Sequence, residues 1–208
     1  MEYGLFSEDE CNQIVCGCDE AGRGPLAGPV VASAVVLPPD FPFHILNDSK
    51  KMTEKERLLA ESVIKEKAVC WAVTSVSHKT IDRINILQAS MLAMRRSYEK
   101  IRNKARIDIV LVDGNKEPDI DIPCKAIVKG DQKIPEIMAA SILAKTERDR
   151  LMKLADRKWP QYGYCRNMGY PTRKHIEAIE QYGPSPIARK TFHVKKKEED
   201  VTPLLFRS

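Results

Sequence analysis

The chain has 208 residues, 43% of them hydrophobic and 30% charged, which is the composition of a globular protein with one substantial core. A net charge of +5 favours an anionic partner without demonstrating one. No stretch approaches the roughly 18 apolar residues of a membrane-spanning helix, and the acidic N-terminus does not resemble a signal peptide. We therefore expect a cytoplasmic protein that has no membrane partner and needs no more than a monomer.

The first half of the chain predicts three strands and two helices. In chain order these are strands at 14–18 and 30–37, a helix at 54–67, a strand at 69–76 and a helix at 86–102. Thr53, followed by Glu54 and Glu56, is typical of a helix N-cap with acids in the first turn. Apolar side chains at helical spacing mark the second helix.

The second half predicts strands at 107–112 and 124–128 and then helices at 137–154 and 172–181. The nearly continuous apolar run at 107–112 indicates a strand that is buried on both faces. Pro135 is acceptable in a first helical turn, and Gly183 with Pro184 ends the last helix. The elements together predict an α/β or α+β fold, in which helices back a mixed sheet and the C-terminal portion is helical.

The cysteines do not form a metal-binding pattern. No two of them have C-x-x-C spacing, so a zinc site is unsupported, and we expect free thiols that pack as small core side chains. They are Cys11, Cys16, Cys18, Cys70, Cys124 and Cys165.

Acidic residues follow three of the predicted strands, each beside a glycine. Asp19 and Glu20 enter a glycine-rich turn, Asp113 precedes a glycine and Asp131 follows one. Any one of them alone is more often a turn former or a helix cap, but the set points to a shared site. Since neighbouring strand residues face opposite sides, the turn after Asp19 must redirect Glu20 if both serve that site.

Clustered carboxylates predict a metal. Two of them ~4 Å apart repel by about 4 kcal/mol at an effective dielectric constant of 20, so the group needs protons or a cation. Hard oxygen ligands suit Mg²⁺ or Mn²⁺, and two such ions about 3.5–4 Å apart can assist phosphodiester hydrolysis. The four histidines are dispersed and show no ligand spacing: His44, His78, His175 and His193.

The segment 17–30, GCDEAGRGPLAGPV, resembles the signature of ribonuclease HII, the type 2 ribonuclease H family. The likeness extends from about residue 15 to residue 192. Further matching motifs follow in order: NDSKK at 47–51, IDRINILQA at 81–89, VDGN at 112–115, KGD at 129–131, AASILAK at 139–145, GYPT at 169–172 and GPSP at 183–186.

The resemblance implies a ribonuclease H-like α/β fold with a five-stranded mixed sheet flanked by helices. It divides the chain into a catalytic core at 1–155 and a C-terminal helical extension with a charged tail at 156–208, packed together as one unit. The implied activity is cleavage of the RNA strand of RNA–DNA hybrids and cleavage 5′ of single ribonucleotides in duplex DNA. The products carry 5′-phosphate and 3′-hydroxyl ends.

The resemblance also implies roles for individual residues. The catalytic acids and ligands of two Mg²⁺ or Mn²⁺ ions are Asp19, Glu20, Asp113 and Asp131, with Asp19 bridging the ions. The turn formed by Gly22, Arg23 and Gly24 would read ribose 2′-hydroxyls, which physically suits a backbone that can approach a sugar edge closely. Tyr170 would pack on the sugar that follows the ribonucleotide, and Lys50 and Lys145 would contact phosphates.

Some positions depart from the commoner family pattern. Ile134 stands where a serine often follows the lysine, Asn167 and Met168 replace a frequent His-Lys pair, and Ala188 replaces a frequent histidine. Two alternatives remain beside a type 2 enzyme. One is a type 3-like ribonuclease H that acts mainly on longer hybrids, although we expect no added N-terminal domain of that type. The other is a non-catalytic nucleic-acid-binding module.

Overall fold

A five-stranded mixed sheet in the order β3-β2-β1-β4-β5 forms the centre of the computed structural model, which describes residues 13–192. β1 pairs antiparallel with β2, and β2 antiparallel with β3, whereas β1, β4 and β5 run parallel. The strands are β1 Val15–Ala21, β2 Val30–Val36, β3 Cys70–Val76, β4 Ile109–Asp113 and β5 Cys124–Ile127. This sheet confirms the fold class predicted from the sequence.

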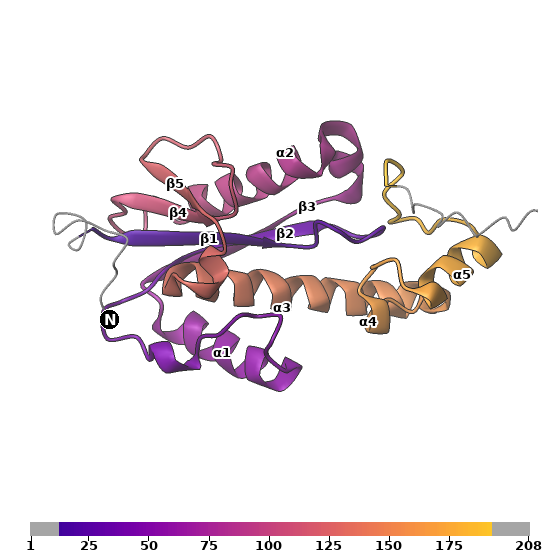
Figure 1. Ribbon diagram of the computed structural model, residues 1–208, viewed down its shortest axis with the longest axis horizontal. Coiled ribbons are helices and arrows are strands. Elements are labelled where there is room, and N and C mark those ends of the chain that lie inside the picture. Colours follow the sequence, from indigo (N-terminus) through magenta and orange to yellow (C-terminus); the bar gives the residue numbers. More distant parts are fainter. Residues whose placement is uncertain (1–12, 193–208) are drawn as a thin grey trace, which may run out of the picture.

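Helices cover both faces of the sheet, and a smaller helical region lies at one end (Figure 1). α2 packs on one face, while α3 packs on the other with α1 outside it. The helices are α1 Glu54–Lys67, α2 His78–Glu99, α3 Pro135–Lys158, α4 Tyr164–Asn167 and α5 Arg173–Tyr182. Short 3-10 turns lie at η2 Phe43–Ile45, η3 Gly130–Gln132 and η4 Pro160–Tyr162. These turns and α4 were not predicted, because three or four residues carry too little periodicity.

Strand alternation assigns the two faces of β1 to two different cores. Cys16 and Cys18 point into the apolar cluster beneath α2. Gly17 lies on the other face, where an added Cβ would stand 2.1 Å from the backbone carbon of Glu136 in α3. The N-terminus of α3 therefore rests directly on the backbone of β1. Asp19, two residues further along, faces this same side.

Several element boundaries differ from the predicted ones. α1 begins as expected, since Thr53 and Glu56 form a reciprocal capping box. The predicted helix at 86–102 is only the second part of α2, which starts at His78 after the cap Ser77. Asn85 breaks the helix with φ 66°, and its side chain accepts a hydrogen bond from the amide of Gln88 at 3.1 Å. Because of this internal cap, the helical spacing of apolar side chains that predicted the helix begins only at residue 86.

The C-terminal helical region packs against the end of α3. α3 continues to Lys158, so the predicted domain boundary at residue 155 falls inside this helix. Met152 and Ala155 of α3 join a separate apolar cluster with Tyr162, Tyr164 and Ala178. The charged tail at 195–200 lies outside the described residues.

The expectation that every cysteine is a core residue was wrong for Cys165, which is exposed on the short helix α4. The described cysteines are all free thiols, and Cys16, Cys18 and Cys70 are buried. Cys11 lies outside the described residues.

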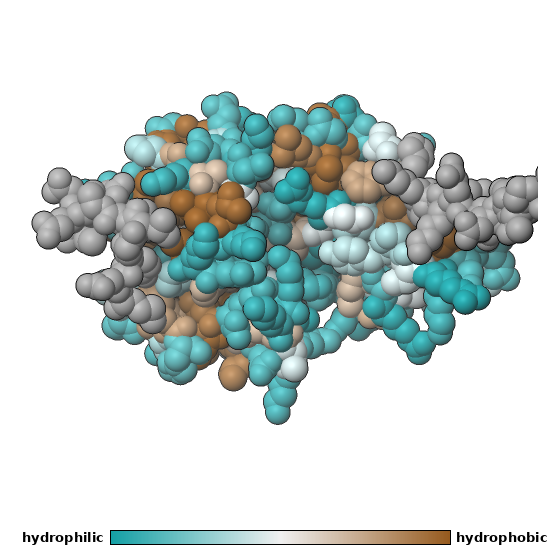
Figure 2. Space-filling model, viewed as in Figure 1, coloured by the Kyte–Doolittle hydropathy of each residue, from teal (hydrophilic) through white to brown (hydrophobic). Residues whose placement is uncertain are grey.

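Within residues 13–192, no helix combines the length and the apolar character needed to cross a bilayer. The face of the molecule in Figure 2 is largely hydrophilic, with apolar side chains in separate patches.

We predict that Gly17→Ala destabilises the fold by about 3 kcal/mol or more, because the new methyl group would overlap backbone atoms of α3 that cannot rotate away. Urea unfolding measures the change. Gly24→Ala is the matched control, since its Cβ would meet nothing closer than 3.6 Å. We expect that variant to stay within about 0.5 kcal/mol of the parent. Equal stability of both variants would contradict the close contact between β1 and α3.

Candidate active site

Three carboxylates meet at the ends of the parallel strands. Asp19 lies near the end of β1, Asp113 is the last residue of β4, and Asp131 lies in the turn η3. One oxygen of each lies within 4.8 Å of those of the other two. Cys18 pairs with Val112, so the parallel register of β1 and β4 sets Asp19 beside Asp113.

Backbone amides bring the third carboxylate to the other two. Lys129 adopts a left-handed conformation with φ 58°, which turns the chain sharply after β5. The amides of Gly130 and Asp131 then donate to Oδ1 of Asp113, at 2.8 and 3.4 Å. A Cβ at residue 130 would stand 2.6 Å from the side-chain end of Ile137, which would have to shift to make room for it.

The cluster resists losing its protons. Asp19 is 4% exposed, and burial together with the charges of Glu20 and Asp113 raises its pKa well above the ordinary value. Hydrogen bonds from Ser141 and from the Glu20 amide oppose this rise only in part. Burial and the charge of Asp131 likewise raise the pKa of Asp113. Protons or a cation must therefore compensate this group at neutral pH.

Glu20 does not join this three-carboxylate cluster. The expected turn after Asp19 is absent, because β1 continues to Ala21 and Glu20 pairs with Ala32 of β2. Glu20 therefore lies outside the group of three oxygens, yet its carboxylate is near enough to Asp113 and Lys50 to feel their charges. Arg23 lies 3.5 Å from the Glu20 carboxylate. Burial raises the pKa of Glu20; Arg23 lowers it in part, and Asp113 raises it further.

A loop before α1 contacts the cluster through side chains that the sequence did not single out. Ser49 and Ser141 share a hydrogen bond of 2.9 Å, and Ser141 in turn lies against Asp19. The side chain of Asp48 accepts a hydrogen bond from Gln132 at 3.3 Å. Only their places in the motifs NDSKK and AASILAK could have indicated these residues, since serines have no periodic pattern.

The two predicted phosphate contacts differ in position. The ammonium of Lys50 lies 3.0 Å from Asp131, at the edge of the three carboxylates, while most of its side chain is exposed. Lys145 instead pairs with Asp149 on its own helix, at 2.7 Å. The structure thus brings Lys50 to the acid cluster but gives Lys145 a carboxylate partner of its own.

A glycine-rich loop from Gly22 to Pro29 follows β1. Gly22 and Gly28 both have positive φ, 99° and 86°, so side chains there would be strained. Tyr170, 44% exposed, stands beside the loop, where a Cβ on Gly24 would be 3.6 Å from its ring. The amide of Leu26 donates to the carbonyl of Gly169 at 2.8 Å, which fixes the two segments together.

The positions that depart from the family pattern have structural partners here. Asn167 is buried, and its side chain bonds the carbonyl of Tyr162 at 2.7 Å and the amide of Gly169 at 2.8 Å. Ala188 forms a bridge with Ala27 of the glycine-rich loop. Ile134 is buried next to the start of α3.

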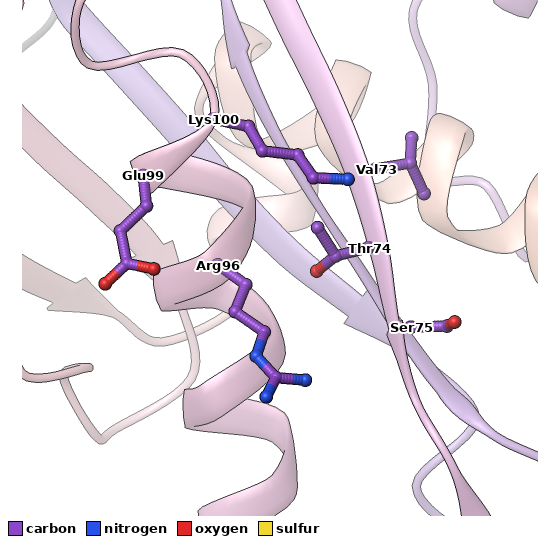
Figure 3. Close-up of a pocket in the computed structure, with 6 residues that line it drawn as sticks. All are labelled: Val73, Thr74, Ser75, Arg96, Glu99 and Lys100. Atoms are coloured by element: carbon purple, nitrogen blue, oxygen red, sulfur yellow. The ribbon is translucent and has the colours of Figure 1, made fainter.

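A separate hollow lies between β3 and the end of α2 (Figure 3). Lys100 extends toward Thr74 of β3, and Arg96 and Glu99 of α2 also line the hollow. No predicted site residue lines this hollow, so we place the chemistry at the acid cluster.

A hard divalent cation fits the donors at the strand ends. Asp19, Asp113 and Asp131 supply oxygen ligands within 4.8 Å of one another, the type of donor that Mg²⁺ and Mn²⁺ prefer. Among residues 13–192, neither Asp19 nor Asp113 has an ion pair with a basic side chain, whereas Asp131 has Lys50. Two of the three charges therefore lack a cationic partner.

Solved structures share this architecture and define its class, a ribonuclease H-like fold. Ribonuclease HII of Archaeoglobus fulgidus, solved in a complex with PCNA, superposes with a TM-score of 0.70 at 23% identity, covering 88% of this chain and 97% of that one. Ribonuclease H2 of Pyrococcus horikoshii gives a TM-score of 0.68 at 28% identity, with coverages of 86% and 93%.

Sequence comparison narrows the class to one family. The family model described as Ribonuclease HII matches residues 16–196. Ribonuclease HII of Dechloromonas aromatica is 55% identical over 179 residues, which are 86% of this chain and 90% of the relative. The Chlorobium luteolum protein of the same name is 52% identical, with coverages of 88% and 89%. The chain belongs to the ribonuclease HII family and is a metal-dependent endoribonuclease of the ribonuclease H type.

We predict that Asp19→Asn stabilises the metal-free protein at neutral pH, by about 1 kcal/mol or more for each unit that the folded-state pKa is raised. The unfolded carboxyl ionises near pH 4. Because the folded pKa lies higher, the folded state holds the proton more tightly, and wild-type stability falls as pH rises from about 4 through the folded pKa. The advantage of the variant should grow as the pH rises from about 4 through the folded pKa and vanish below about pH 4. Thermal unfolding in a chelator at several pH values measures it.

Asp108→Asn is the control, for which we expect the opposite change in stability. A hydrogen bond from the amide of Ile14 and a contact with Arg106 lower the pKa of Asp108, so its replacement should reduce stability at neutral pH. Mg²⁺ should stabilise the wild type more than Asp19→Asn. An Asp19→Asn variant that is less stable than wild type at neutral pH would contradict the electrostatic description of the cluster.

Proposed function

We propose that the protein hydrolyses the RNA strand of RNA–DNA hybrids and cuts 5′ of single ribonucleotides in duplex DNA, leaving 5′-phosphate and 3′-hydroxyl ends. The observation that carries this proposal is the cluster of Asp19, Asp113 and Asp131 at the start of a glycine-rich loop that also contacts an exposed tyrosine. The three carboxylates can hold metal for phosphodiester hydrolysis, and the loop with its tyrosine can contact a sugar. Membership of the ribonuclease HII family supports both parts.

We assign metal binding to Asp19, Glu20, Asp113 and Asp131. When bound, two Mg²⁺ or Mn²⁺ ions would supply the means to activate a water and to stabilise the leaving oxygen. The charges of both Glu20 and Asp113 act on Asp19, which would suit a ligand shared by two ions. Ser141 and the amide of Glu20 hold the Asp19 carboxylate in place. The Glu20 carboxylate is close enough for the charge of Asp113 to raise its pKa, which supports a role at the edge of the same site.

We assign substrate recognition to the loop and to side chains around it. The backbone of Gly22, Arg23 and Gly24 can approach a ribose edge and bond its 2′-hydroxyl, the group that distinguishes RNA from DNA. Tyr170, exposed beside Gly24, can pack on the next sugar.

Two lysines are proposed as phosphate contacts. The exposed Lys50 can exchange its bond with Asp131 for a phosphate oxygen of the bound strand. The same role for Lys145 requires it to leave Asp149, so its contribution should be the smaller of the two.

Product mapping on a DNA duplex with one ribonucleotide tests the proposed activity. We expect one cut 5′ of the ribonucleotide, with a 5′-phosphate and a 3′-hydroxyl, in Mg²⁺ and in Mn²⁺ run separately. Asp19→Asn should lower the rate by more than about 100-fold, since even partners that only orient a metal ligand are worth 10–100-fold. Binding of the hybrid should persist. Cleavage of long hybrids alone would indicate a type 3-like enzyme, and binding without cleavage in the wild type would indicate a non-catalytic module.

We predict that Tyr170→Ala reduces cleavage at a single ribonucleotide by roughly 10-fold more than cleavage of a long hybrid, because the variant loses the ring on which the sugar packs and only the junction requires that contact. The ratio of the two kcat/KM values measures the effect. Tyr182→Ala is the matched control, an exposed tyrosine on α5 whose loss should leave that ratio unchanged. Equal losses on both substrates would refute a junction-reading role for Tyr170.

A further inference from the structure

Two buried guanidinium groups lie beneath the glycine-rich loop. Arg148 of α3 is 1% exposed and Arg189, in the segment after α5, is 2% exposed. Buried arginines usually pair with carboxylates, since an uncompensated buried charge is costly. Among residues 13–192, neither of these two forms an ion pair with a carboxylate, and burial lowers the pKa of both, that of Arg189 to about 9.

Backbone carbonyls of the loop take the place of carboxylates as partners of Arg189. Its Nη2 donates to Gly22 at 2.6 Å and to Pro29 at 3.2 Å, and its Nη1 donates to Arg23 at 2.9 Å. Its Nε donates to Gly28 at 3.0 Å. One side chain thus holds both ends of the loop. The planar fork of five donors makes this possible, and a lysine cannot reproduce it.

Arg148 supports the loop from the side of α3. It donates to the carbonyls of Pro29 at 3.2 Å and Ala27 at 3.3 Å. A Cβ on Gly22 would stand 2.0 Å from its Nε, so the loop lies directly against the guanidinium. The same group lies 5.9 Å from the centre of the Tyr170 ring. Arg148 therefore contacts both of the elements that we propose to read the sugar.

We propose that Arg148 and Arg189 are positioning residues that set the backbone of the Gly22–Gly24 turn for ribose recognition. This inference rests on the proposed function. A carbonyl that bonds a guanidinium cannot swing away, so the neighbouring amides stay aimed at the substrate. The lack of an ion pair also matters, because the charges of Asp149 and Asp82 offset the two positive charges behind the loop only in part, and the remainder favours the approach of a phosphate.

The test compares how well variants distinguish ribose from deoxyribose. In an Asp19→Asn background, which prevents turnover, the Kd for an all-DNA duplex is divided by the Kd for the same duplex with one ribonucleotide. We expect Arg189→Gln and Arg189→Lys each to reduce this ratio by about 10-fold or more, because bonds from a charged donor are lost. With Asp19 intact, the same variants should raise KM for the ribonucleotide duplex.

Ile64→Ala is the control for a general loss of stability, since Ile64 is a buried residue of α1 whose apolar cluster includes no residue of the loop. It should lower the unfolding midpoint yet keep the ratio of the wild type. Arg148→Met serves as the second variant if Arg189→Gln does not fold. Folded variants that keep the wild-type ratio and KM would overturn the proposal, as would full rescue by Arg189→Lys. A wild-type ratio of one would instead refute the proposed reading of the ribose.

Discussion

Mutual repulsion among the carboxylates of Asp19, Asp113 and Asp131 is the constraint around which the neighbouring structure is arranged. Their oxygens lie within 4.8 Å of one another, where the folded state must hold them against their charge. Parallel pairing of β1 with β4 fixes two of them, and amides of the turn η3 fix the third against Asp113. The cluster is a local destabilisation that the two apolar cores on either side of the sheet offset.

The support for this cluster comes largely from α3. Its first turn rests on Gly17, two residues before Asp19, and its second contains Ser141, whose hydroxyl bonds Asp19. Further along, the same helix contributes Arg148 beneath the glycine-rich loop and Met152 to the cluster that anchors the C-terminal region. A single rigid helix contacts both the acid cluster and the loop, so it fixes the distance between these two parts of the candidate site.

The sequence predicted the architecture well because apolar periodicity and strand-end acids are local signals. All five strands and the long helices lie near their expected positions, and Asp19, Asp113 and Asp131 do meet. The course of β1 past Asp19 was not predicted, since pairing of Glu20 with Ala32 depends on a distant strand. The partners Ser49 and Ser141, 92 residues apart, leave no periodic trace. Arg148 and Arg189 were not singled out from the sequence, because only the folded chain shows that carbonyls surround them.

The closure of the glycine-rich loop by Arg189 also orders events during synthesis of the chain. The bond between Arg189 and Gly22 joins residues 167 positions apart, among the longest sequence separations in the molecule. A nascent chain that has emerged only as far as α5 already contains all the acids of the cluster, but it lacks the side chain that holds the loop. The clustered carboxylates are therefore present well before the side chain that holds the glycine-rich loop, and the loop acquires its bonds to Arg189 only when the last described segment has folded back.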